Sequence, residues 1–190
     1  MIIEAAIVLP VFFVFVFLVI EGAMLFSDWQ GLNNGLFSAA RTATVYGNDN
    51  LTDYQTLVNF KRDFSAVNID QLQGFSVFKA TSATATITAG CKTGSSIGVC
   101  NFYSANDIKL VPSTPPTLYF GTCTANGVGG GKDASWCPET RKVAVAGANG
   151  PPDYVGVWAK IRHNQPTKIF GAFKDIEQTI VIKIEPQKLT

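Results

Sequence analysis

The chain has 190 residues, of which 47% are hydrophobic, and a formal net charge of +1 at pH 7. This length accommodates one compact domain with an appended segment. The 15 Lys and Arg residues are scattered, without a run that could follow a phosphate backbone, so nucleic acid is not expected as a partner.

The first element is an apolar run over residues 5–26, which holds most of the excess hydrophobicity. As a helix it would be about 33 Å long, enough to cross a hydrocarbon core of roughly 30 Å. A cleavable signal peptide is the rival interpretation, but such peptides begin with a basic region. Here the first basic residue is Arg41. We therefore expect a membrane-spanning segment whose basic leader has been removed or lies outside the sequence.

The helical period continues beyond this run. Polar residues separate apolar ones that recur at steps of three or four and form one predicted buried face: Leu25, Trp29, Leu32, Leu36, Ala39, Ala40, Ala43 and Tyr46. The pattern predicts one helix from about residue 3 to about residue 46, ending at Gly47. Its first half would lie in the membrane and its second half would pack on a globular domain. Gly31 and Gly35 weaken the helix or let a neighbouring helix approach closely.

The rest of the chain, residues 48–190, is predicted to be an extracytoplasmic domain distinct from residues 1–47. Thr52 or Asp53 is expected to cap a short helix that runs to about residue 65. A period of two then predicts strands at 75–80, 83–88, 142–146, 154–163 and 175–185, with a long loop-rich stretch at 89–141. These elements predict an α+β fold, in which the long hydrophobic helix packs on an antiparallel β-sheet.

Four cysteines lie in the loop-rich stretch: Cys91, Cys100, Cys123 and Cys137. Three connectivities are possible, and the local one, 91 to 100 and 123 to 137, would close two loops that have little else to hold them. A bridge around a loop of about 15 residues adds roughly 3 kcal/mol in the chain-entropy model. Zinc binding is the competing interpretation, but no Cys-x-x-Cys spacing occurs and the single histidine is remote in sequence. Disulfides indicate an oxidising, extracytoplasmic compartment.

Motifs for catalysis or cofactor binding are not apparent. The Gly-rich segment 126–133 departs from a phosphate-binding loop, because Asn126 replaces the first glycine and Asp133 replaces the final Ser or Thr. His163 has no Ser or Cys motif around it, so we expect a structural residue at the surface or at a sheet edge. Asn50 begins a glycosylation sequon, a pattern frequent by chance. The sequence thus predicts no cofactor, no metal and no enzyme.

Two carboxylates, Glu4 and Glu21, flank the uncharged apolar run. A carboxylate at the centre of a bilayer costs about 2.5 to 3.5 kcal/mol and is usually paired. Glu4 could neutralise the free N-terminal ammonium of a neighbouring subunit, or could lie in the head-group region at the helix N-terminus. Glu21 is expected near the membrane boundary, where water can reach it.

The chain resembles the TadE-like proteins of tight-adherence (Tad) pilus systems, which belong to the type IV pilin superfamily. The resemblance begins with a glutamate followed by an apolar stretch into Leu-Pro, and it continues at a second glutamate, an Ala-Ala-Arg helix end and two closing strands. The matching segments are residues 4–10, 19–22, 38–47, 155–161 and 180–186. Residues 66–150 carry no recognisable pattern.

This resemblance implies a leader cleaved by a prepilin peptidase just before the apolar helix. Glu4 takes the place of the pilin glutamate, which in the superfamily usually stands fifth in the mature chain. Pro10 becomes a weak point that permits local melting of the pilin-like helix when it leaves the membrane. The implied assembly residues are Glu4, Pro10 and Glu21.

The leading functional hypothesis is a filament-forming pilin of the cell surface, with a role in adhesion or surface attachment. The implied partners are identical subunits in a helical homopolymer, the prepilin peptidase, the pilus assembly machinery and, before assembly, the membrane. A second hypothesis is a minor pilin-like component that acts in assembly. A third, from another class, is a membrane-tethered ligand-binding domain or enzyme.

Overall fold

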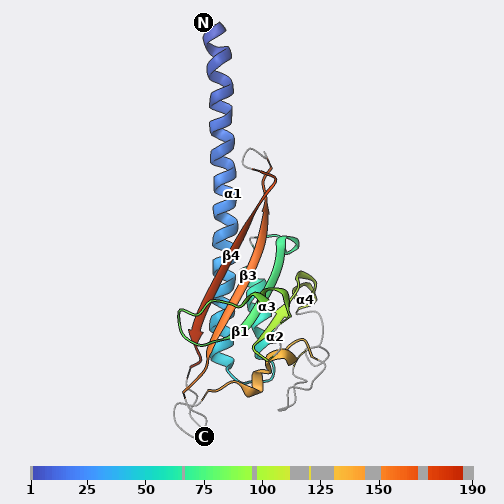
Figure 1. Ribbon diagram of the computed structural model, residues 1–190. Coiled ribbons are helices and arrows are strands. Elements are labelled where there is room, and N and C mark those ends of the chain that lie inside the picture. The colour runs from blue at the N-terminus through green and yellow to red at the C-terminus, as the bar shows by residue number, and fades with distance from the viewer. Residues whose placement is uncertain are drawn as a thin grey trace.

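The computed structural model describes residues 2–65, 67–95, 98–111, 120, 131–143, 151–166 and 171–185, with side chains from residue 7 onward. One long helix dominates the molecule, and its first half stands clear of the rest of the described chain (Figure 1). The second half lies along a β-sheet. The sequence-based prediction of an α+β fold, with a long apolar helix packed on an antiparallel sheet, is confirmed.

The long helix, α1, spans Ile2–Tyr46 and passes through Pro10 without interruption. It ends where Gly47 adopts a left-handed φ of 56°, a conformation that favours glycine, and the Gly47 amide donates to the Ala43 carbonyl at 3.2 Å. Five side chains of the second half are completely buried in the core: Leu32, Leu36, Ala39, Ala40 and Ala43. The predicted bounds and the predicted end at Gly47 are confirmed.

Helix α2, Thr52–Asp63, packs against α1. A Cβ atom at Gly35 would lie 3.2 Å from the ring of Phe60 and 3.2 Å from the Cβ of Phe64, so this glycine permits the close approach of the two helices. The predicted cap is wrong: the N-cap residue is Leu51, without a side-chain cap bond. The Thr52 hydroxyl instead donates to the Asp49 carbonyl at 2.7 Å, and Asp53 turns into the protein interior.

The sheet has four antiparallel strands in the order β2-β1-β3-β4. Their bounds are Leu72–Ala80 for β1, Cys100–Tyr103 for β2, Tyr154–Asn164 for β3 and Phe173–Lys183 for β4. Strands β1, β3 and β4 confirm three of the predicted strands with small shifts. Strand β2 lies inside the stretch predicted as loop, and its four residues are too few to show a period.

The predicted strand at residues 83–88 is wrong. The chain turns there, with the Ala85 amide donating to the Ser82 carbonyl at 3.1 Å, and then enters the short helix α3, Ala89–Thr93. The alternation of small and apolar residues arises because Ile87 packs onto the sheet while its neighbours face outward. Of the predicted strand at 142–146, residues 142 and 143 are not in a strand and residues 144–146 lie outside the described part of the chain.

The two faces of the sheet are covered differently. Phe75, Val77, Val157 and Ile161 face α1 and α2 and form the main core. On the other face, Phe78 and Trp158 lie under α3 and a disulfide. The remaining short elements are α4 and three 3-10 helices: Ala105–Leu110, Ile69–Gln71, Ala134–Trp136 and Pro138–Thr140.

The disulfide joins Cys91 of α3 to Cys100 of β2, with a Cα–Cα distance of 5.8 Å. It confirms the first predicted bridge. Cys137 is a buried free cysteine, and its expected partner Cys123 lies outside the described residues. The second bridge therefore stays a prediction.

Candidate functional site

The first half of α1 presents apolar side chains to its surroundings on every side. The exposed large hydrophobic residues between Ile7 and Ile20 have exposed fractions of 36% to 68%. A helix that is apolar all round is stable only when lipid or other helices cover it. Among the described residues, α1 is the one helix long and apolar enough to cross a membrane. This surface is the main candidate for function.

The end of the exposed segment is marked by Glu21, which is only 5% exposed. The expectation that water reaches this carboxylate is therefore wrong for the isolated chain. A buried carboxylate is costly in free energy unless it is paired or hydrogen-bonded, so burial of Glu21 needs a compensating contact. Among the described residues, Glu21 is thus the first buried side chain of α1, and continuous burial of the helix begins only near Leu32.

Farther along α1 from Glu21, toward the C-terminal end of the helix, a polar contact joins α1 to the sheet. His163 of β3 and Asp28 of α1 lie 2.6 Å apart, from Nδ1 to Oδ2, and the histidine is buried. Because its side chain is buried, His163 is not a surface residue, contrary to one part of the expectation; it lies beyond the β1–β3 ladder, where β3 pairs only with β4. A structural role fits its position, since the contact fixes α1 against β3.

The second half of α1 has one buried and one exposed side. Phe26, Phe37 and Val45 are exposed, Phe37 to 61%, and together with Trp29 they extend the apolar surface of the first half toward Tyr46. The prediction that Trp29 and Tyr46 belong to the buried face is wrong, because both are more than a third exposed. Sequence reasoning missed this exposed stripe. The available signal was Phe37, a large apolar residue out of phase with the buried positions.

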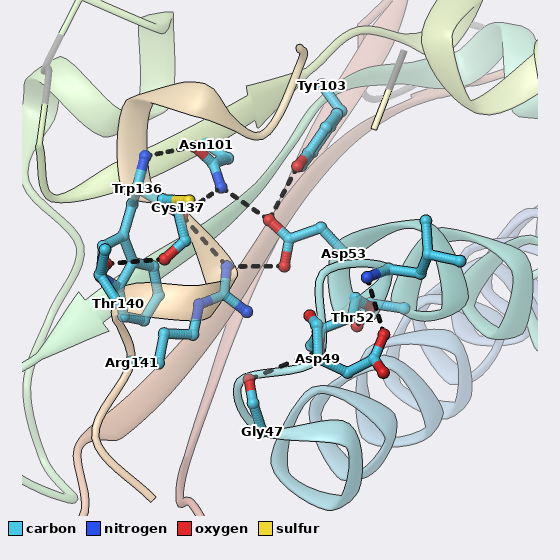
Figure 2. Close-up of polar contacts among 12 residues, drawn as sticks. Gly47, Asp49, Thr52, Asp53, Asn101, Tyr103, Trp136, Cys137, Thr140 and Arg141 are labelled. Atoms are coloured by element: carbon cyan, nitrogen blue, oxygen red, sulfur yellow. Dashed lines mark hydrogen bonds and ion pairs between the residues drawn. The ribbon is translucent and has the colours of Figure 1, made fainter. Parts of the chain in front are cut away.

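A second polar feature, which we call the Asp53 cluster, consists of Asp53, Asn101, Tyr103, Trp136 and Arg141 (Figure 2). The Asp53 carboxylate receives hydrogen bonds from Asn101 Nδ2 at 2.6 Å and from the Tyr103 hydroxyl at 2.9 Å. Arg141 Nη2 lies 2.7 Å from its other oxygen, and neither charged side chain is exposed to solvent. The cluster joins α2, β2 and the segment 134–141, which are distant in sequence.

The Asp53 cluster is closed to ligands because its charged groups are completely buried. The Asn101 side chain also bonds both backbone groups of Trp136, and the Arg141 guanidinium stacks 4.2 Å from the centre of the Trp136 ring. Burial and the negative charge of Asp53 raise the pKa of Tyr103 well above its ordinary value of 10. We conclude that this cluster ties α2, β2 and the segment 134–141 together.

The other predicted site residues lie at the exposed end of α1. Glu4 falls within the helix, but its side chain lies outside the described part, whereas Pro10 lies in the exposed segment. Within the described residues there is no group of three or more His, Cys, Asp or Glu side chains placed to hold a metal ion.

A comparison with protein families gives a match at the N-terminal end of the chain. Residues 1–41 match the model of the TadE-like protein family. Over these residues the chain is TadE-like. No curated protein and no solved structure matches the chain.

The TadE-like region contains the whole exposed segment of α1 and most of the covered half. Together with the long hydrophobic helix, it is consistent with a pilin-like protein of the Tad pilus type, associated with a membrane or secreted. Proteins of this kind are generally not enzymes. The match ends before α2, so it includes neither the sheet nor the Asp53 cluster.

Proposed function

We propose that this chain is a structural subunit of an extracellular type IV or Tad-like filament and that it polymerises through the first half of α1. One observation carries the proposal: apolar side chains are exposed on all sides of α1 from Ile7 to Ile20, in a helix that continues into the core of a folded domain. Such a surface is stable in lipid and in a bundle of similar helices. A subunit can therefore pass from the membrane into a filament without exposing this surface to water.

In the proposed filament, residues 1–47 form the core and residues 48–190 form the outer surface. Identical subunits related by open helical symmetry can add without limit, as a pilus requires. Before assembly the chain resides in the membrane, where a prepilin peptidase and the pilus assembly machinery act on it. Adhesion or surface attachment is the proposed role of the finished fibre.

Three residues have proposed roles in assembly. Glu4 would pair with the free N-terminal ammonium of a neighbouring subunit inside the bundle. Pro10 lacks a backbone donor, so α1 can loosen there while it leaves the membrane. Glu21 would mark the depth at which the bundle gives way to the domain, because it is shielded by its own chain.

The alternative is a minor TadE-like component that primes or assists assembly. The size of the domain favours this alternative, since residues 48–190 exceed what a helix needs for polymerisation. A membrane-tethered binding domain is the third candidate.

Electron microscopy of filaments sheared from native cells, with mass spectrometry of their main component, tests these proposals. If this chain dominates the filament and begins near residue 1, it is the structural pilin. Low copy number in the membrane fraction, together with co-purification of pilus components, would support the minor component instead. Absence from filaments and from pilus complexes would contradict both.

A further inference from the structure

A second surface lies where α1 leaves the domain, beside the start of β4. A groove of about 520 Å³ separates the two elements, with Gly22, Leu25, Phe26 and Trp29 on one wall and residues 174–177 of β4 on the other. Three aromatic side chains are exposed at this end, namely Phe26 at 56%, Trp29 at 38% and Phe173 at 52%. We use the name junction surface for the following set: Gly22, Leu25, Phe26 and Trp29 of α1, Arg162 of β3, and Phe173 with residues 174–177 of β4.

The junction surface lies at one level along α1. Lys174 pairs with His163 in the β3–β4 ladder, and His163 contacts Asp28, so the start of β4 lies beside that turn of the helix. Trp29 lies about 14 Å beyond Ile20 along the helix axis. The head-group layer of a bilayer is about 5 to 8 Å thick on each side. A hydrocarbon boundary placed from Met24 to Phe26 therefore puts Trp29 in this layer.

The aromatic side chains of the junction surface suit that position. The amphipathic rings of Trp and Tyr concentrate at the level of the head groups, where an apolar body and a polar edge are both accommodated, and Trp29 is such a ring. Trp29 and Phe26 stack on each other, with ring centroids 5.8 Å apart. The guanidinium of Arg162, on β3, lies 4.3 Å from the centre of the ring of Phe173, on β4.

The charges of this region leave a basic group available. Asp175 pairs with Lys160 and Arg162, which lower its pKa to about 2, and Glu177 pairs with Lys92. On α1, Asp28 contacts His163 and Glu21 is buried. Lys174 is exposed and has no ion-pair partner among the described residues. A cation of this kind, beside exposed rings, suits anionic lipid phosphates.

We propose that the junction surface is a membrane-interface anchor that binds the head-group layer of the bilayer, with anionic lipids as its favoured contacts. The proposal rests on the membrane residence of the chain before assembly. It adds a second contact between protein and bilayer, on a strand more than 130 residues after Phe26 in the sequence. Two contacts fix the depth and the rotation of α1, which one helix crossing a bilayer does not do alone.

The test uses the full chain in vesicles of phosphatidylcholine with a minor share of phosphatidylglycerol. An environment-sensitive fluorophore is attached in turn to Phe26→Cys, Phe173→Cys, Val45→Cys and Phe12→Cys, and its quenching by lipids brominated near the head group or in the acyl chain is compared with quenching by aqueous iodide. Val45 is the matched control because it is also about half exposed and lies on the same helix, about 28 Å beyond Phe26. The chain without an added cysteine measures labelling of the buried Cys137.

We expect lipid quenching at Phe26→Cys and Phe173→Cys, iodide quenching at Val45→Cys and acyl-chain quenching at Phe12→Cys. Iodide quenching at Phe173→Cys equal to that at Val45→Cys, with Phe12→Cys still quenched by lipid, overturns the anchor alone. Loss of lipid quenching at Phe12→Cys instead overturns the proposed membrane residence. Protection of Phe173→Cys from both quenchers that grows with the protein-to-lipid ratio shows a second copy on this surface and also overturns the anchor.

The contact with anionic lipid has its own measurement. In the Phe173→Cys chain, lipid quenching is expected to increase with the share of phosphatidylglycerol, and Lys174→Gln is expected to abolish that increase. Lys142→Gln is the charge-matched control. Lys142 lies at the end of the domain away from the first residues of β4, so this variant should leave the increase in lipid quenching unchanged. If lipid quenching depends equally on the share of phosphatidylglycerol in all three chains, the preference for anionic lipid is overturned.

Discussion

The two halves of α1 belong to one uninterrupted helix but differ in what stabilises them. In the first half, apolar side chains are exposed on every side of the helix, whereas in the second half Leu32, Leu36 and Ala39 are completely buried under α2 and the sheet. The second half can therefore be destabilised by changes far away in the domain. The first half depends on lipid or on other subunits, and changes in the domain should leave it intact.

The largest expected effect comes from opening the Asp53 cluster with Arg141→Ala. The change leaves the Asp53 carboxylate buried without its ionic partner, which costs about 3 to 5 kcal/mol of folding free energy. In detergent micelles we expect hydrogen exchange to accelerate in the second half of α1 and to stay unchanged in the first half. Equal acceleration of hydrogen exchange in both halves would contradict the view that only the second half of α1 depends on the domain.

A matched control for Arg141→Ala is Arg62→Ala. Arg62 also pairs with an aspartate, its sequence neighbour Asp63, but it lies at the surface. No measurable loss of stability is expected, because exposed ion pairs are weak. A loss as large as that of Arg141→Ala would show that burial is not the cause.

Tyr103→Phe tests the same cluster more gently. Removing a hydrogen bond to a buried carboxylate should cost about 1.5 to 3 kcal/mol, measured by urea unfolding in micelles near pH 8. The variant should also change the response to alkali. The pKa of Tyr103 is raised in the folded chain, so above pH 10 the unfolded chain loses this proton first and stability falls as the pH increases.

In Tyr103→Phe that contribution to alkaline destabilisation is absent. The difference in stability between wild type and variant should therefore be constant below pH 10 and should shrink above it. A difference that stays constant to pH 11 would mean that Tyr103 ionises as readily in the folded chain as in the unfolded one.

The elements of the fold and the Asp53 cluster differ in how far they could be predicted from the sequence. Period and composition predicted α1, β1, β3 and β4 because each is long enough to repeat its pattern several times. The Asp53 cluster could not be predicted, since Asp53 and Arg141 are separated by most of the domain and follow no common spacing. Asp53 instead suggested a helix cap, which is its usual role near a helix N-terminus.

The next effect concerns the contact between the two helices. Gly35→Val should destabilise the domain by about 1 to 3 kcal/mol, because a side chain there meets Phe60 and Phe64. Gly22→Val is the control on the same helix, since nothing lies within 4 Å of an added Cβ atom. Thermal unfolding in micelles measures both, and equal effects would show that helix propensity, not packing, dominates.

The smallest effect on folding is expected from Phe37→Ser, on the exposed side of α1. Its stability should change by about 0.5 kcal/mol or less, whereas Leu36→Ser, at the adjacent buried position, should be strongly destabilising. If the exposed stripe packs in a filament, Phe37→Ser should nevertheless reduce the yield of sheared filaments. Normal yield would restrict polymerisation to the first half of the helix.

The contact between His163 and Asp28 also bears on mechanical load. A pull on the N-terminal half of α1, as during extraction from a membrane, reaches the sheet through this buried contact to β3. Strand β3 is hydrogen-bonded to β4 along its whole length and to β1 from Tyr154 to Ile161. Tension is thus passed to an inner strand and shared between two ladders in shear, so the domain can be dragged by its helix without being unravelled from an edge.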